Sequence, residues 1–232
     1  MAQWLSDAPN GFSEVENPSD GSIIGTAPNG SAGLAENAVM AASLATGTTT
    51  IHNAAQEPEI SDLCECLIAM GAQISGHGTS TITIEGVSAL HGATHEVVAD
   101  RIEAGSFIIG AAMTGGALRL RKARLDHLTA LQEVLIKVGV MLESGRSETG
   151  EPFIDVTPPT ALTAVDVETA PYPGFPTDLQ AQYMALMCVA DGTSHISETI
   201  FENRFMHVPE LVRMGADITI EGGVAIVKGK VK

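Results

Sequence analysis

The sequence predicts an α+β fold built from a repeated unit of about 70 residues. Three passages, beginning near Asn37, Gly105 and Asp178, share one order of features. Each has a helix of small apolar residues, a glycine turn, a short strand, an amphipathic helix, a second glycine turn and a further strand. The chain has 232 residues, 44% of them hydrophobic, which is enough to bury helices against sheets in this way.

Two sets of glycines keep the same phase in the three passages. The first set follows the small-residue helices and consists of Gly47, Gly116 and Gly192. The second set ends the amphipathic helices and consists of Gly71, Gly139 and Gly215. Each member of the second set follows an apolar-periodic run, so we expect a left-handed backbone there, which glycine adopts at little cost.

The two helices of each passage differ in their expected burial. The first is dense in Ala and Met and nearly free of charge, so it must be buried on most sides. The second is amphipathic, as shown by the run Leu128, Leu131, Val134, Leu135 and Val138. The short strands are predicted at 48–51, 118–120 and 194–196. Residues 1–30 show little periodicity and predict loop or weak strand, so we assign them as an irregular N-terminal segment.

Charge and composition exclude several classes of partner. The formal net charge of −16 argues against a nucleic-acid-binding or anionic-membrane-binding protein, each of which needs a basic face. A few clustered cations can still bind a small anion. No apolar run is long enough to span a membrane, and the first residues lack the pattern of a signal peptide. We therefore expect a cytoplasmic protein.

The three cysteines, Cys64, Cys66 and Cys188, predict reduced thiols because their number is odd and their spacing fits no disulfide framework. Their positions on predicted helices favour small core side chains over reactive thiols. The basic cluster Arg119–Arg124 is predicted to be a solvated strand edge, with a ligand patch as the alternative.

Four motifs carry a resemblance to a known family. They read "NAAQEPEI", "ADRIEAGSF", "FPTDLQAQ" and "FENRFMHVPEL". With the repeat, they make the chain resemble the UDP-N-acetylglucosamine 1-carboxyvinyltransferases, the UDP-GlcNAc enolpyruvyl transferases of the EPSP synthase-like superfamily. The resemblance extends with few gaps from about Gly30 to Gly229. The related enzymes of the shikimate pathway share the fold but are not similar at "FPTDLQAQ".

The resemblance implies an α/β prism made of repeated βαβαββ units. A complete member has six units in two globes, and this chain holds three. Residues 31–98 correspond to the last unit of the first globe, and residues 99–232 to the first two units of the second. The final unit is absent, so we expect an unsealed second globe that self-associates.

The implied reaction transfers the enolpyruvyl group from phosphoenolpyruvate to the 3-hydroxyl of UDP-N-acetylglucosamine and releases phosphate. In the family this begins peptidoglycan precursor synthesis, and thus cell-wall formation. It needs a base for the sugar hydroxyl, an acid for the enol carbon and cations for the anionic groups. No cofactor and no metal is implied. The family's reactive cysteine lies outside this chain, so activity of the chain alone is doubtful.

Asp178 is the candidate catalytic base on this resemblance. Thr177 and Gln180 have the spacing of a capping box, which predicts Thr177 as the N-cap, with Asp178 in the first helical turn. The resemblance implies that Thr177 also binds substrate. The alternative is that Asp178 only complements the helix dipole.

The remaining candidates bind substrate. Arg204 is assigned to the phosphate-bearing substrate, with pairing to Glu202 or Glu198 as the structural alternative. Ile200 is assigned to the uridine-sugar site. The stretch Ser31, Ala32 and Gly33 matches the family segment that presents backbone amides to the pyrophosphate, although Asn29 replaces the usual lysine.

Two other functions stay open at this point. The chain can be a non-catalytic truncated scaffold or a UDP-sugar-binding descendant that lacks the cysteine loop. It can also keep the fold and catalyse another reaction, like the shikimate-pathway transferases or the phosphate cyclases. The intact "FPTDLQAQ" and "FENRF" motifs argue against this last alternative.

Overall fold

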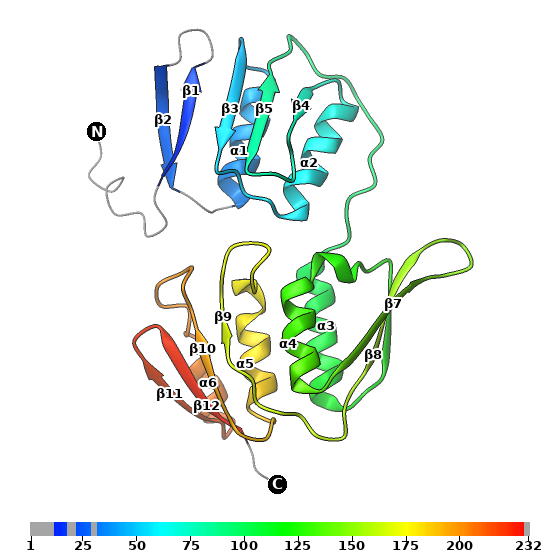
Figure 1. Cartoon of the computed structure of the whole chain (residues 1–232), viewed down its shortest axis with the longest axis vertical. Coiled ribbons are helices and arrows are strands. Elements are labelled where there is room, and N and C mark those ends of the chain that lie inside the picture. Colours follow the sequence, from blue (N-terminus) through cyan, green and yellow to red (C-terminus); the bar gives the residue numbers. More distant parts are fainter. Residues whose placement is uncertain (1–11, 18–21, 29–31, 230–232) are drawn as a thin grey trace. The chain divides into compact units, whose positions relative to one another are not determined.

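The chain divides into two compact units, Met1–Val98 and Ala99–Lys232. The computed structural model describes residues 12–17, 22–28 and 32–229 (Figure 1). Both units combine helices with mainly antiparallel sheets, which confirms the predicted α+β class.

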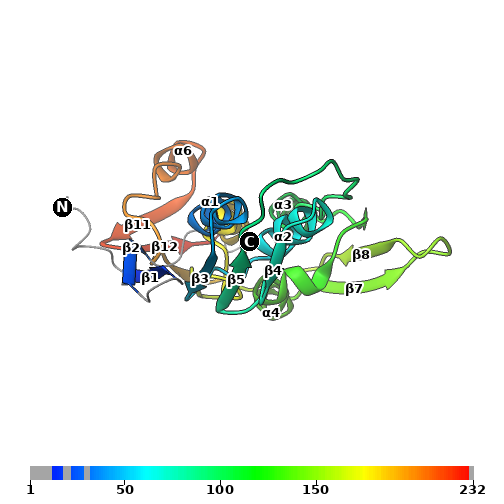
Figure 2. The ribbon, with the colours of Figure 1, turned by 90° about the horizontal axis from the view of Figure 1, so that it is seen from above.

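The first unit is a five-stranded antiparallel sheet with two helices. Its elements are β1 (Phe12–Asn17), β2 (Ser22–Pro28), α1 (Ala32–Ser43), β3 (Thr48–His52), α2 (Pro58–Ala69), β4 (Gln73–Ser75) and β5 (Thr81–Glu85). The strands pair in the order β2-β1-β3-β5-β4. The helices α1 and α2 lie side by side on one face of the sheet (Figure 2). Val39, Ile60, Ile82 and Ile84 are fully buried there, because alternation along β5 turns every second side chain toward the helices.

The segment predicted to be irregular contains a β-hairpin. Strands β1 and β2 pair antiparallel from Phe12 opposite Pro28 to Asn17 opposite Ser22, and β1 also pairs with β3. Of the two predictions for residues 1–30, loop or weak strand, the structure shows strand at these two segments. Their sequences alternate weakly, and pairing with β3 provides the support that an isolated hairpin lacks.

The second unit has two sheets with helices packed between them (Figure 1). Its elements begin with α3 (Arg101–Thr114), β6 (Leu118–Arg121), α4 (Thr129–Val138), β7 (Met141–Arg146), β8 (Pro152–Thr157) and β9 (Val167–Glu168). They continue with α5 (Gln180–Met187), β10 (Thr193–Ser197), α6 (Val208–Arg213), β11 (Asp217–Glu221) and β12 (Val224–Lys228). One sheet has the order β6-β8-β7 and the other β11-β12-β10-β9.

One element order, α-β-α-β-β, occurs at α1–β5, at α3–β8 and at α5–β12. In all three, the first strand pairs with the last, and the last pairs with the middle one. The glycines after the second helices, Gly71, Gly139 and Gly215, have φ of 101°, 105° and 100°, which confirms the predicted left-handed backbone.

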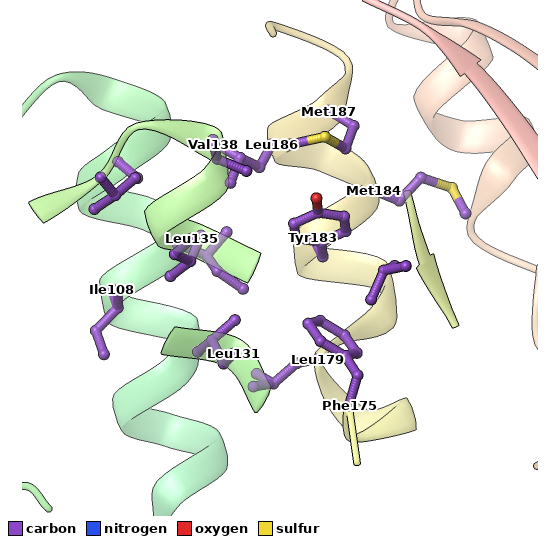
Figure 3. Close-up of a cluster of buried hydrophobic side chains, with 14 of the residues drawn as sticks. Ile108, Leu131, Leu135, Val138, Phe175, Leu179, Tyr183, Met184, Leu186 and Met187 are labelled. Atoms are coloured by element: carbon purple, nitrogen blue, oxygen red, sulfur yellow. The ribbon is translucent and has the colours of Figure 1, made fainter. Parts of the chain in front are cut away.

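The core of the second unit lies between α3, α4 and α5 (Figure 3). Leu131, Leu135 and Val138 point from α4 toward the side chains of α5, as their helical spacing predicts. Tyr183 of α5 is fully buried, contacts the Phe175 ring edge-on at 5.4 Å between centroids, and donates its hydroxyl to Val165 O at 2.8 Å. The longest described helix is α3, and none of the described helices is long and apolar enough to cross a membrane.

A close approach fixes the distance between α3 and the start of α5. Gly105 of α3 is buried, and a Cβ placed on it would lie 2.6 Å from Cδ1 of Leu179 and 3.2 Å from Cδ2 of Leu131. Both leucines are fixed in the core, with exposed fractions of 0% and 1%. Leu179 directly follows Asp178, so this contact positions the backbone of the candidate base.

We expect Gly105→Ala to lower the free energy of unfolding by roughly 1–3 kcal/mol, because the added methyl overpacks the core. Gly110→Ala on the same helix is the matched control, since a Cβ there meets nothing within 4 Å. It should stabilise the protein by up to about 1 kcal/mol through helix propensity. Denaturant unfolding measures both, and equal effects of the two substitutions would contradict the packing argument.

Candidate functional site

Asp178 lies in a short 3-10 helix, Thr177–Leu179, that leads into α5. The predicted capping box is absent, because Pro176 is the N-cap residue and no side chain caps the turn. The Thr177 hydroxyl instead donates to Glu198 Oε2 at 2.8 Å. The prediction that Thr177 caps the helix is thus wrong, since a carboxylate from another segment competes for its hydroxyl.

Arg204 lies in the turn that follows β10. Helix α5 runs away from the 3-10 turn and β10 returns beside it, so the start of α5 and the end of β10 lie at the same end of the unit. This reversal brings the motif "FPTDLQAQ" next to the motif "FENRF" across 26 positions of sequence.

Asp178 and Arg204 form an ion pair. Nη2 of Arg204 donates to Oδ1 of Asp178 at 2.5 Å. The guanidinium carbon also lies 5.0 Å from the centre of the exposed Phe201 ring, in the range of a cation–π contact. The alternative pairing of Arg204 with Glu202 or Glu198 is therefore wrong, and the two residues assigned to chemistry contact each other directly.

Both members of the pair remain accessible to a ligand. The exposed fraction of the side chain is 35% for Arg204 and 57% for Asp178. An ion pair this exposed contributes only about 0–1 kcal/mol to stability. The fold therefore depends little on this pair, and its charged atoms can exchange partners with a substrate.

Glu198 connects the turn that carries Asp178 with the turn that carries Arg204. Its carboxylate accepts hydrogen bonds from Thr169 Oγ1 at 3.0 Å and Thr177 Oγ1 at 2.8 Å, with Gln180 Nε2 at 3.5 Å. It also accepts from the backbone N–H groups of Ile200 at 2.9 Å and Phe201 at 3.1 Å. Sequence reasoning assigned it no role of its own, because donors from three separate segments are not visible in a local pattern.

His207 lies beside Arg204 at the start of α6. It is half-buried, and its Nε2 has no hydrogen-bond partner within the described part of the chain. Burial lowers the pKa of His207, and the positive charge of Arg204 lowers it further. The imidazole is therefore kept neutral next to the guanidinium.

The structure brings together four of the seven predicted site residues, Thr177, Asp178, Ile200 and Arg204. Gly33 lies in the first turn of α1 in the other unit, where its carbonyl accepts from Asn37 Nδ2 at 2.7 Å. Ala32 is the first residue of α1. Ser31, and the Asn29 that precedes it, fall outside the described residues.

A small pocket of the second unit adjoins the 3-10 turn. Its lining includes Arg101, His127, Tyr172 and Pro176, and the Arg101 guanidinium carbon lies 5.3 Å from the centre of the Tyr172 ring. Pro176, which lines this pocket, directly precedes Thr177 in the sequence, so the pocket adjoins the segment that carries Asp178.

Other charged groups are paired away from the site. Arg119 binds Asp155 through two hydrogen bonds of 2.6 and 2.5 Å, and Arg121 binds Glu151 at 2.8 Å. These pairs fit the predicted solvated strand edge better than a ligand patch. Within residues 12–17, 22–28 and 32–229, no three His, Cys, Asp or Glu side chains are grouped to hold a metal.

Comparison with known proteins shows the family. A family model described as EPSP synthase (3-phosphoshikimate 1-carboxyvinyltransferase) matches residues 14–232. The chain belongs to the EPSP synthase family. A crystal structure of the enolpyruvyl transferase NikO from Streptomyces tendae is similar in fold, with a TM-score of 0.76 and 25% identity over 85% of this chain and 46% of that one.

Within the family, the similar curated relatives carry the name that the motifs suggested. UDP-N-acetylglucosamine 1-carboxyvinyltransferase of Granulibacter bethesdensis is 58% identical over 87% of this chain and 47% of its own length. The protein of that name from Paracoccus denitrificans is 52% identical over 96% of this chain and 52% of its own. These matches confirm the resemblance, and the chain spans about half the length of the relatives.

We expect protonation of His207 to destabilise the fold. A histidine whose folded pKa is lowered contributes stability that is present above its unfolded pKa of about 6.5 and is lost as the pH falls through the folded value. The midpoint of denaturant unfolding should therefore decrease on acidification, and less so in His207→Gln. His52→Gln, at an exposed position in the first unit, is the control. Equal pH dependence in wild type and His207→Gln would contradict this assignment.

We expect Cys64 to be nearly unreactive in the folded protein. Burial, and secondarily the nearby Glu65, raise the pKa of the Cys64 thiol to about 11, and burial also raises the pKa of Cys188. Because the thiolate is the reacting form, Cys64 should react with Ellman's reagent at about pH 8 roughly 100-fold more slowly than in the unfolded chain. Cys64→Ser identifies its kinetic phase, and a fast phase lost in that variant would contradict the burial argument.

Proposed function

We propose that the chain provides the Asp178–Arg204 face of an enzyme that transfers the enolpyruvyl group from phosphoenolpyruvate to the 3-hydroxyl of UDP-N-acetylglucosamine, releasing phosphate. The observation that carries the proposal is the ion pair itself. Two motifs that resemble the UDP-N-acetylglucosamine 1-carboxyvinyltransferases converge on one accessible carboxylate and one accessible guanidinium.

Asp178 acts as the base in this proposal. As the sugar 3-hydroxyl oxygen bonds to C2 of phosphoenolpyruvate, its proton passes to the carboxylate, and C3 gains a proton from an acid. The tetrahedral intermediate then loses a C3 proton while the C2–O bond to phosphate breaks. The Arg204 contact occupies Oδ1 of Asp178, which leaves Oδ2 to face a sugar hydroxyl.

Arg204 binds the phosphate-bearing substrate. A guanidinium has five N–H donors, and its contact with Asp178 uses Nη2. The remaining donors suit the paired oxygens of a phosphate, and binding there strengthens as charge grows on the leaving group. Ile200, whose backbone is fixed by Glu198, provides an apolar contact to the uridine-sugar portion.

The first unit contributes the pyrophosphate contact. Ala32 and Gly33 begin α1, where backbone N–H groups favour an anion, and Ser31 precedes them in the sequence. We assign residues 31–98 to the last unit of the first globe of an α/β prism, and residues 99–232 to the first two of the second. We further propose that the second globe self-associates, and that the reaction belongs to cytoplasmic peptidoglycan precursor synthesis.

The decisive experiment mixes the 232-residue chain with both substrates and measures phosphate release, with UDP-N-acetylglucosamine binding followed separately by calorimetry. Turnover supports the proposal in full. Binding without turnover supports the alternative, a sugar-nucleotide binder that lacks the cysteine loop. The absence of both binding and turnover would overturn the proposed function for this chain.

We expect Asp178→Asn to reduce turnover by about 10²–10⁴-fold, the usual contribution of a positioned general base. Its effect on the free energy of unfolding should stay below about 1 kcal/mol, because the pair it breaks is exposed. Glu202→Gln removes one negative charge from the neighbouring turn and serves as the control. Full turnover in Asp178→Asn would exclude Asp178 as the base.

A further inference from the structure

We propose that Glu198 is a positioning residue, whose carboxylate holds the turn that carries Asp178 against the turn that carries Arg204. The inference rests on the proposed function of that pair, and it adds a residue to which no role in the reaction has been assigned.

The donors to Glu198 come from three separate segments. Thr169 lies just after β9, Thr177 and Gln180 lie at the entrance of α5, and the N–H groups of Ile200 and Phe201 begin the turn after β10. A carboxylate has lone pairs on both oxygens for such donors. One side chain therefore accepts hydrogen bonds from three segments, two of which lead into Asp178 and Arg204.

The two carboxylate oxygens of Glu198 accept hydrogen bonds from different turns. Oε2 accepts from Thr177, the residue directly before Asp178, and lies 3.5 Å from Gln180 Nε2. Oε1 accepts from Thr169 and from the N–H groups of Ile200 and Phe201, which begin the turn that leads to Arg204. A rigid carboxylate plane thereby sets the distance between the two turns.

The backbone around Glu198 is itself fixed by hydrogen bonds. Its N–H donates to Gly223 O at 2.9 Å, and its neighbour Thr199 donates its N–H to Thr169 Oγ1 at 2.9 Å and its hydroxyl to Thr169 O at 2.5 Å. Thr169 is fully buried. The anchoring point is thus buried, while the pair that it positions is exposed, as expected for a site supported by a second layer of hydrogen bonds.

The test uses NMR of the ligand-free chain. The Nη–H signal of Arg204, assigned with Arg204→Lys, reports on its pairing through Nη2, and Asp178→Asn defines the unpaired position of that signal. We expect Glu198→Gln to move the signal most of the way to the unpaired position. The new amide donates where Oε2 or Oε1 accepted, so it cannot satisfy all of the same donors.

Matched variants separate positioning from general stability. Glu202→Gln removes the same charge from an exposed side chain two positions before Arg204, and it should leave the signal in place. Thr177→Val deletes one donor at nearly constant shape and should move the signal partially, which keeps the test usable if Glu198→Gln does not fold. A Glu198→Gln protein that melts earlier but keeps the wild-type signal overturns the proposal, as does an equal shift in Glu202→Gln.

A second arm distinguishes this inference from the proposed function. UDP-N-acetylglucosamine is titrated into the wild-type chain while the same signal is followed. A ligand response together with an unmoved signal in ligand-free Glu198→Gln overturns the role of Glu198 alone. A moved signal in Glu198→Gln without any ligand response in wild type supports the role of Glu198 and counts against the proposed function.

Discussion

The contact between Gly105 and Leu179 is the constraint on which the second unit and its candidate site depend. At this point α3 comes so close to the entrance of α5 that a Cβ on residue 105 would lie 2.6 Å from Cδ1 of Leu179 and force that side chain to shift. Leu179 fills the space and is fully buried together with Leu131 of α4. The position of Leu179 fixes the 3-10 turn, and Asp178 then points away from the core because its neighbour points into it.

The site combines a rigid interior with an exposed surface. The core side of the turn is apolar and closely packed, and dense packing resists displacement. The opposite side has the Asp178–Arg204 pair, which contributes little to stability because solvent screens it. A ligand can therefore compete for these charges at small cost to the fold. The hydrogen bond from Thr177 to Glu198 lies between the apolar core and the exposed ion pair. It holds the residue before Asp178 in place relative to the core.

Local patterns predicted the elements better than their junctions. The apolar spacing of Leu131, Leu135 and Val138 identified the buried face of α4 correctly, because a helix in contact with a core follows its own period. The left-handed glycines were predictable for a similar reason, since a helix that ends in a turn requires that backbone locally. The hairpin β1–β2 was not predicted, because its pairing with β3 depends on residues distant in sequence.

The candidate site shows the same division. Asp178 and Arg204 were identified through motifs, yet their direct contact across 26 positions was not predicted. The predicted capping box does not form, because tertiary structure brings a strong acceptor close to the hydroxyl that would have capped the helix. Here that acceptor is Glu198, and it takes the Thr177 hydroxyl. The position of Asp178 is thus decided by long-range hydrogen bonds and by core packing rather than by the helix that follows it. Since α5 extends only over Gln180–Met187, its dipole is a minor influence next to a full charge on Arg204. The Asp178–Arg204 pair can form only after α3, α5 and β10 have come together, which makes it a property of the folded unit and not of the motif.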